Sequence, residues 1–199
     1  MDSIICIGSI STSQLGEVWV AMSERGLVTV EFSVSRGQFE ATVRRQTRRE
    51  IQDAPRQEAA RVAQAACEIA EYLRGKRRVF DMSIDWSILA SDFQRTALRA
   101  VMAVPYGERR TYGQIAAQIG RPDAPRAVGR ANATNPMPLV IPCHRVVGSD
   151  GKLHGYGGAG GLKTKQWLLE MEGALQGQSL IMQQEAGSRQ RTRIQLTGG

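Results

Sequence analysis

Two short apolar runs on either side of a tight turn limit the possible folds of this chain more than any other feature. In residues 15–32, LGEVWVAMSERGLVTVEF, two strand-like runs flank the sequence SERG, which is a favourable connection for a β-hairpin. An amphipathic helix is predicted next, in PRQEAARVAQAACEIAEYLRG, with Gly75 as its stop. Its apolar positions at helical spacing are Ala59, Val62, Ala66, Ile69 and Leu73. Residues 1–88 therefore predict a small mixed α/β domain.

Residues 89–173 predict helices separated by helix breakers. The sequence SDFQ at 91–94 matches a capping box and opens a helix through about Val104. The apolar face of this helix is expected to contain Phe93, Ala97, Leu98 and Val101. TYGQ at 111–114 is a second capping box, which opens a short helix that Gly120 ends. This second part is expected to be a mainly helical domain.

A third helix is predicted in APRAVGRANAT, with Asp123 as its cap, Pro125 in its first turn, and an end near Asn132. Two short helices with a tight connection form a helix-turn-helix pattern. Most side chains of the third helix are small, apart from a few that include Arg126 and Arg130. Such a helix either docks closely into a nucleic-acid groove or packs tightly inside the protein.

Length and composition set broad limits. At 199 residues the chain can bury a normal core, as one domain or two small ones. Its 42% hydrophobic and 23% charged residues argue against wholesale disorder, and no run approaches the roughly 18 apolar residues of a membrane helix. The N-terminus shows no secretion signal. The sparse cysteines, Cys6, Cys67 and Cys143, predict a cytoplasmic protein without disulfides, with Cys6 and Cys67 as core thiols.

The net charge of +7 is distributed unevenly. Residues 1–88 carry 12 basic and 12 acidic side chains, whereas residues 89–173 carry 11 and 6, and residues 174–199 carry 3 and 1. A local basic excess suits a surface that binds a polyanion such as nucleic acid, but it also suits a solubilising surface. The arginine cluster within residues 44–49 is expected to be a solvated loop or helix face.

Cys143 and His144 stand side by side in NPMPLVIPCHRVVGSDG, in a chain with only three cysteines and two histidines. They could form a nucleophile with its base, part of a metal site, or a buried thiol beside a polar turn. A free thiol is only a few per cent ionised at neutral pH, so a nucleophilic Cys143 needs a base or electropositive surroundings. In an extended segment successive side chains point to opposite faces. His144 therefore reaches the sulfur only if the backbone bends or a water bridges them.

A nucleophilic pair also needs an acid that orients the histidine, and WLLEMEG at 167–173 offers Glu170 and Glu172. A zinc site usually needs four ligands at suitable spacings, and His154 is the only other histidine. We therefore expect no metal.

The motif IPCHRVV, preceded by RAVG and NP and followed by GYGG and KTKQWLLEMEG, resembles the O6-alkylguanine-DNA alkyltransferase family (methylated-DNA–protein-cysteine methyltransferase). The likeness covers about residues 93–173. Residues 1–88 resemble more loosely the family's α/β N-terminal domain of RNase H-like topology, and residues 89–173 its helical, winged-helix-like domain with a helix-turn-helix. The resemblance implies direct-reversal DNA repair. An alkyl group on O6 of a flipped-out guanine, or on O4 of thymine as an alternative, passes irreversibly to Cys143, once per molecule.

The resemblance also implies roles for single residues. The catalytic set would be Cys143 as acceptor, His144 as its base through a water, Glu172 as the acid that polarises His144, and Tyr112 as an aid to flipping and a proton donor. Expected DNA contacts are Thr111, Arg126, Ala127, Gly129, Arg130 and Asn135, with Arg126 filling the gap left by the base and Asn135 as a hinge. The expected substrate pocket contains Asn135, Pro138, Val146, Val147, Tyr156 and Gly157, with the backbone near Pro142 and Val147 reading the base edge. The partner would be duplex DNA, bound through its minor groove by a monomer without a cofactor, and cooperative binding is left open.

Three features depart from the family pattern. Gly157 follows Tyr156 where some relatives have serine, so one side-chain contact to the lesion oxygen would be missing. The loop GYGGAGG is about two residues longer, which would admit bulkier alkyl groups or leave the loop disordered. No histidine precedes His144, in contrast to zinc-binding relatives. Residues 174–199 are expected to form a flexible extension.

Other functions stay open at this point. One is a lesion-binding module without transfer, against which Cys143 argues. Another is a cysteine hydrolase or acyltransferase, which multiple turnovers on a small ester or amide would reveal. A purely structural DNA-binding protein would have no use for the Cys143-His144 pair.

Overall fold

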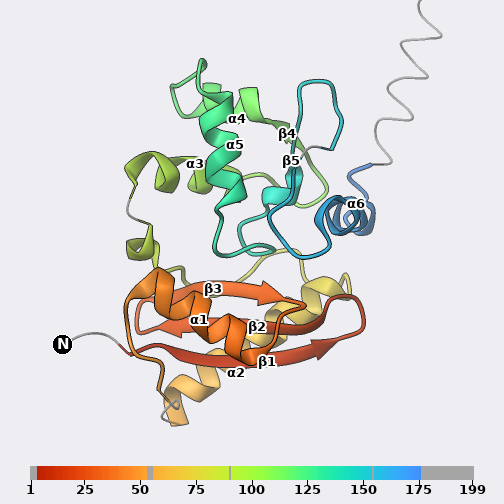
Figure 1. Ribbon diagram of the computed structural model, residues 1–199. Coiled ribbons are helices and arrows are strands. Elements are labelled where there is room, and N and C mark those ends of the chain that lie inside the picture. The colour runs from red at the N-terminus through yellow and green to blue at the C-terminus, as the bar shows by residue number, and fades with distance from the viewer. Residues whose placement is uncertain (1–3, 53–55, 90, 154, 176–199) are drawn as a thin grey trace, which may run out of the picture.

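The computed structural model describes residues 4–52, 56–89, 91–153 and 155–175. The lower layer in Figure 1 is an antiparallel sheet whose strands lie in the order β1 (Cys6–Thr12), β2 (Gly16–Ser23) and β3 (Gly26–Phe32). Ser23 pairs with Gly26 across a two-residue connection, so the predicted hairpin is confirmed. Gly26 has a φ of 139°, and a Cβ at this position would lie 2.4 Å from the Ser83 carbonyl oxygen. Only glycine fits this turn.

One helix covers each face of the sheet. α1 (Arg36–Thr47) packs Phe39 and Val43 against one face, and α2 (Arg56–Leu73) packs Val62 and Ile69 against the other. The amphipathic helix that the sequence predicts before Gly75 is therefore confirmed as α2, although Ala59 in its first turns is exposed. The arginines at the end of α1 are mostly exposed, as expected for a solvated helix face; these are Arg44, Arg45 and Arg48, with Arg49 half-buried.

The cysteine expectations hold for one residue and fail for the other. Cys6 is buried, but Cys67 is exposed, so its prediction as a core thiol is wrong. The buried stripe of α2 is centred on Ala66 and Ile69. Successive residues of a helix are separated by a little over a quarter turn, which places Cys67 on the solvent side of that stripe.

The helical part lies above the sheet in Figure 1. Its helices are α3 (Asp92–Met102), α4 (Tyr112–Gln118), α5 (Pro125–Ala133) and α6 (Gly161–Met171). A short parallel pair joins β4 (Arg110–Thr111) to β5 (Val146–Val147), and two 3₁₀ turns lie at Trp86–Ile88 and Cys143–Arg145. α4 and α5 pack together as the predicted pair of short helices.

The helix caps follow the sequence only in part. The capping box at 111–114 is complete, since Thr111 accepts from the Gln114 backbone and Gln114 reaches back to the Thr111 N–H. At α3, Ser91 caps the helix, but the Gln94 amide instead donates to Thr134 at the end of α5. α3 also ends at Met102, two residues before the expected Val104.

The predicted cap of α5 is wrong. The residue at its N-cap is Ala124, and no side chain caps this helix, so Asp123 does not perform that role. The backbone N–H of Ala124 instead donates to the Arg121 carbonyl within the preceding turn. Pro125 does stand in the first turn, where its missing N–H costs nothing.

A continuous apolar core joins the sheet to the helices. It runs from Val20 and Val30 in the sheet through Leu98 in α3 to Leu168 in α6. The Val30 N–H of β3 also donates to the Pro136 carbonyl at 2.9 Å. The sheet edge therefore helps to hold the segment that leads to Cys143. Within the described ranges, no helix has the length and apolar character needed to cross a membrane.

Candidate active site

A tight turn brings the Cys-His pair into the protein. Residues Cys143–Arg145 form a 3₁₀ turn after Pro142, so the backbone bends where the sequence argument required a bend or a bridging water. The Cys143 N–H donates to the Ile141 carbonyl at 2.8 Å. Cys143 is 5% exposed and His144 is fully buried. The thiol is thus held inside the protein rather than displayed on its surface.

Asn135 braces the segment before the turn. Its amide nitrogen donates to the Ile141 carbonyl at 2.9 Å, and its amide oxygen accepts from the Met137 N–H at 3.0 Å. Between them the buried Leu139 adopts a φ of 75°, which is unfavourable for a residue with a branched side chain. Asn135 thus ties the end of α5 to the residues just before Cys143, the position expected for a hinge.

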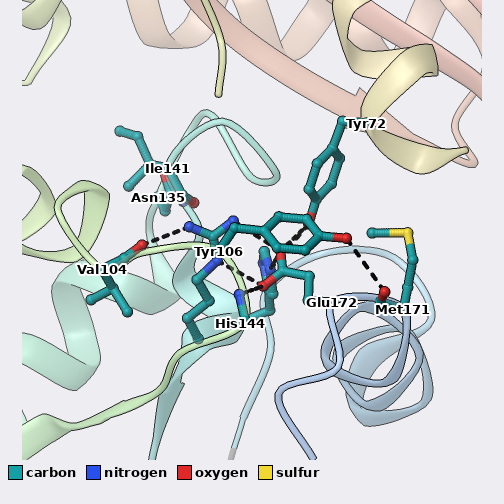
Figure 2. Close-up of polar contacts among 10 residues, drawn as sticks. Tyr72, Val104, Tyr106, Asn135, Ile141, His144, Met171 and Glu172 are labelled. Carbon is teal, nitrogen blue, oxygen red and sulfur yellow. Dashed lines mark hydrogen bonds and ion pairs between the residues drawn. The ribbon is translucent and has the colours of Figure 1, made fainter. Parts of the chain in front are cut away.

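Glu172 lies at the centre of the buried polar contacts in Figure 2. His144 Nε2 lies 2.9 Å from Glu172 Oε1, and Arg145 donates to both carboxylate oxygens, at 2.9 Å each. The Tyr72 hydroxyl, from α2, donates to Oε1 at 2.6 Å. Glu170 is exposed and accepts a hydrogen bond from Gln166. The structure therefore brings Glu172, and not Glu170, to the histidine.

These contacts fix the protonation of His144. Burial alone would raise the pKa of Glu172, but hydrogen bonds from His144 and Arg145 outweigh it and lower the pKa to about 2. An ionised carboxylate can only accept, so the hydrogen on His144 must be on Nε2. Burial lowers the pKa of His144, which keeps the ring neutral, and Nδ1 has no hydrogen-bond partner among the described residues. Nδ1 is therefore a free base inside the site.

The sulfur is protonated at rest. Burial raises the pKa of the Cys143 thiol, although nearby Asn135 and Lys165 oppose the rise. Lys165 is fully buried, donates to the Val146 carbonyl at 2.6 Å, and has its pKa lowered by burial to about 8. Burial and the charge of a Cys143 thiolate raise the pKa of Tyr112, so this phenol keeps its proton at neutral pH. Across the described residues, no three His, Cys, Asp or Glu side chains are grouped to hold a metal ion.

Two cavities meet at Cys143. One, of about 240 Å³, is lined by Tyr112, Asn132, Tyr156 and Gly157 among others. The second, of about 170 Å³, lies toward β3 and includes Asn135, Pro138, Gly157 and Phe32. Four of the expected pocket residues thus line these cavities. Val146 and Val147 are buried side chains of β5 and line neither of the two.

α5 combines the two alternatives that its composition left open. Its inner face is buried through Val128, Ala131 and Asn132, while Arg126 and Arg130 are exposed. Ala127 and Gly129 are half-buried at the border, and a Cβ on Gly129 would touch the Tyr112 ring at 3.9 Å. The helix therefore packs tightly on one side and presents two arginines on the other.

Sequence reasoning missed several residues of the site. Tyr72 is separated from Glu172 by 100 positions, and nothing in its local sequence indicates this contact. Arg145 stood within the motif, but only the fold shows that it binds Glu172 and the Val104 carbonyl. Asn132 was seen only as the end of a helix.

Comparisons with known proteins agree with this site. Residues 92–174 match the family described as 6-O-methylguanine DNA methyltransferase, DNA binding domain. A methylated-DNA–protein-cysteine methyltransferase from Mycolicibacterium paratuberculosis is 51% identical over 110 residues, which are 55% of this chain and 64% of that protein. The chain thus aligns with less than two thirds of that relative. The Salmonella typhimurium protein of the same name is 40% identical over 162 residues, 81% of this chain and 92% of that protein.

The chain belongs to the methylated-DNA–protein-cysteine methyltransferase family. A solved structure, Mycobacterium tuberculosis OGT in complex with DNA, superposes with a TM-score of 0.67 and 33% identity, over 86% of this chain and 93% of that one. The small sheet with its helices is thus the two-part fold of this methyltransferase family.

Proposed function

We propose that this protein repairs duplex DNA by direct reversal, moving an alkyl group from O6 of guanine to Cys143 in one irreversible step. Alkylated O4 of thymine is a second target. The observation that carries the proposal is the buried His144–Glu172 pair directly after Cys143, together with the cavity that Cys143 lines beside α5 and its exposed arginines. Family membership supports the same reaction.

The proposed chemistry balances within the site. The sulfur attacks the alkyl carbon, the S–C bond forms, and the C–O6 bond breaks with its electron pair going to the oxygen. His144 Nδ1 takes the thiol proton, directly or through one water, and Glu172 stabilises the resulting imidazolium. Tyr112 gives a proton to the departing guanine, and solvent restores the protonation of both residues. The thioether product has no easy hydrolytic exit, so each molecule acts once.

DNA is proposed to bind along the exposed face of α5 through its minor groove. The M. tuberculosis relative has been solved with DNA bound. Arg126 would fill the space of the flipped base, and Arg130 and Thr111 would contact the backbone. Ala127 and Gly129 would let the helix approach closely. Extrusion costs a few kcal/mol, which an inserted side chain partly offsets. Tyr156 and Gly157 would line the base pocket with Asn135 and Pro138, and the backbone near Val147 would read the base edge.

The finer architecture belongs to the same proposal. We assign residues 1–88 to an α/β domain of RNase H-like topology and residues 89–173 to a winged-helix-like domain. The antiparallel hairpin with flanking helices and the α4–α5 pair support these assignments. Most of the expected tail, 174–199, lies outside the described residues. A cytoplasmic monomer is proposed, in agreement with three cysteines that are all free.

The test is the intact mass of the protein after incubation with duplex DNA that contains O6-methylguanine. We expect a gain of one methyl group per molecule, on the peptide that contains Cys143, and no gain in Cys143→Ala, which should still bind DNA. Methyl transfer by Cys143→Ala would overturn the proposal. Repair of many lesions by one molecule would also overturn it and would favour a turnover enzyme such as a cysteine hydrolase.

A further inference from the structure

Asn132 stands where the two cavities meet. Among the residues that the structure describes, three line both cavities, namely Asn132, Cys143 and Gly157. Asn132 comes from the inner face of α5 and is 6% exposed. An alkyl group that reaches the Cys143 sulfur through either cavity therefore enters a space that this carboxamide also lines.

Neither the nitrogen nor the oxygen of the Asn132 carboxamide makes a hydrogen bond of normal geometry to a described residue. The Tyr112 hydroxyl lies close enough to interact with it: burial raises the pKa of Tyr112, and a side-chain hydrogen bond from Asn132 opposes that rise. By contrast, Asn135, three residues later, uses both of its amide atoms within the protein. A buried unpaired amide costs free energy. Water can relieve this cost only by occupying the cavity, and a bound base would displace that water.

The third shared residue cannot supply a polar side chain. A Cβ at Gly157 would lie 2.7 Å from the Ala133 carbonyl oxygen, so this position accepts only glycine in this loop. A hydroxyl contact to the lesion from position 157 is thereby excluded. Of these three residues, Cys143 is the proposed nucleophile, Gly157 has only backbone groups, and Asn132 has a side-chain amide donor.

We propose that Asn132 contacts the substrate, with its amide nitrogen donating a hydrogen bond to the O6 oxygen from which the alkyl group leaves. This inference rests on the proposed function and adds a residue to it. The electron pair of the breaking C–O6 bond goes to that oxygen, so the hydrogen bond is stronger in the transition state than in the bound substrate. A donor placed where charge develops raises the rate of the chemical step.

The first test compares two leaving atoms. Single-turnover rate constants are measured at saturating protein with duplex DNA carrying O6-methylguanine, or the analogue in which sulfur replaces the lesion oxygen. Asn132→Leu keeps the side-chain size and removes the donor. We expect it to slow transfer from oxygen at least tenfold. Transfer from sulfur, a weak acceptor, should slow by less than threefold or so. Equal losses on the two substrates would overturn the inference.

The second test uses stability to separate a ligand contact from a structural one. Because Asn132→Leu removes an unpaired buried group, we expect the melting temperature of the free protein to rise by about 2–4 °C. Asn135→Leu is the matched control and should lower it, since two hydrogen bonds are lost. A lower melting temperature for Asn132→Leu would show that the carboxamide is structural and would overturn the inference.

The outcomes also separate this inference from the proposed function. If the unchanged protein gains no methyl group on Cys143, the proposed function fails. If it does and Asn132→Leu transfers at the same rate, only the role of Asn132 fails. Asn132→Ala gives the same comparison of oxygen and sulfur substrates if the leucine variant does not fold.

Discussion

At the scale of single residues, neither the Cys143 sulfur nor the His144 ring is charged in the resting protein. Burial raises the pKa of Cys143 and lowers that of His144, so the pair is neutral until a proton moves between them. The ionised Glu172 contacts Nε2, across the ring from Nδ1, and would stabilise the imidazole once it is charged. The thiolate would therefore form only as the alkyl carbon approaches.

This arrangement predicts how the transfer rate depends on pH. Burial moves the pKa of His144 below its usual 6.5, so Nδ1 stays unprotonated at pH 6.5 and above. We expect the single-turnover rate constant to be unchanged between pH 7.5 and 6.5 and to fall at lower pH, as His144 takes up a proton and loses its function as a base. Rapid-quench measurements of methyl transfer across pH 5–7.5 would check this. A rate that rises on acidification would contradict it.

Tyr72 provides a second prediction for a single residue. Its buried hydroxyl donates to a charged oxygen of Glu172 at 2.6 Å, and hydrogen bonds to charged groups contribute about 1.5–3 kcal/mol. Tyr72→Phe should lower the free energy of unfolding by that amount in urea denaturation. The control is Tyr106→Phe, because Tyr106 donates to the neutral Met171 carbonyl at 3.3 Å. A loss of about 1 kcal/mol or less is expected there, and equal losses would contradict the argument.

At the scale of helices and strands, the features that the sequence predicted correctly are those encoded by residues close together in the chain. The hairpin, α2 and the complete capping box of α4 are encoded by residues a few positions apart, and the sequence indicated all three. The prediction of Asp123 as a helix cap was wrong because Ala124 occupies the N-cap position of α5. The prediction of Cys67 as a core residue was wrong because a cysteine in an amphipathic helix can lie on either the buried or the exposed face.

Contacts between distant elements could not be read in the same way. Cys143, His144 and Glu172 were predicted from the resemblance to a known family, and the structure shows the contact between His144 and Glu172. The link from Tyr72 to Glu172 depends on how α2 packs against the helical part. The absence of a well-formed hydrogen bond at the Asn132 amide depends on how the surrounding elements pack. Neither the contact between Tyr72 and Glu172 nor the state of Asn132 can be predicted from neighbouring residues in the sequence.

The helix caps of the α4–α5 pair give a prediction with an internal control. Thr111 completes a capping box, so Thr111→Ala should reduce the free energy of unfolding by about 1 kcal/mol, and Thr111→Ser should restore most of it. Asp123 caps nothing, so Asp123→Ala should change stability by no more than about 0.5 kcal/mol. Urea denaturation of the three variants measures both effects. A similar loss for Asp123→Ala would show a cap that the structure lacks.

α5 carries the prediction for DNA. Arg126 is exposed and points away from the core face of the helix. Arg126→Ala should slow repair of a lesion in duplex DNA about tenfold or more, because nothing then fills the space of the extruded base. Reaction with the free base O6-methylguanine, which needs no extrusion, should change little. Equal losses on duplex and free base would remove the proposed finger role.

At the scale of the whole molecule, Glu172 couples the site to stability. With a folded pKa of about 2 against a usual 4.5, its ionised form stabilises the fold by on the order of 3 kcal/mol above pH 4.5, and this contribution is lost as pH falls toward 2. Thermal unfolding between pH 2 and 7 should show this loss. Glu172→Gln should flatten the profile over pH 2–4.5 and slow alkyl transfer, whereas exposed Glu170→Gln should do neither. The same flattening in Glu170→Gln would contradict the assignment of the acid.

Backbone segments from outside the sheet cover the free edge of β3, and this has a consequence for the whole protein. The Leu27 N–H donates to the Ser83 carbonyl, and the Leu27 carbonyl accepts from the Asp85 N–H. The Val30 N–H donates to the carbonyl of Pro136, seven residues before Cys143. Bare strand edges are the places where protein chains join side by side and aggregate. The peptide that leads to Cys143, the proposed nucleophile, therefore also shields this edge of the sheet from neighbouring molecules. A change that pulls this peptide away would cost solubility together with repair.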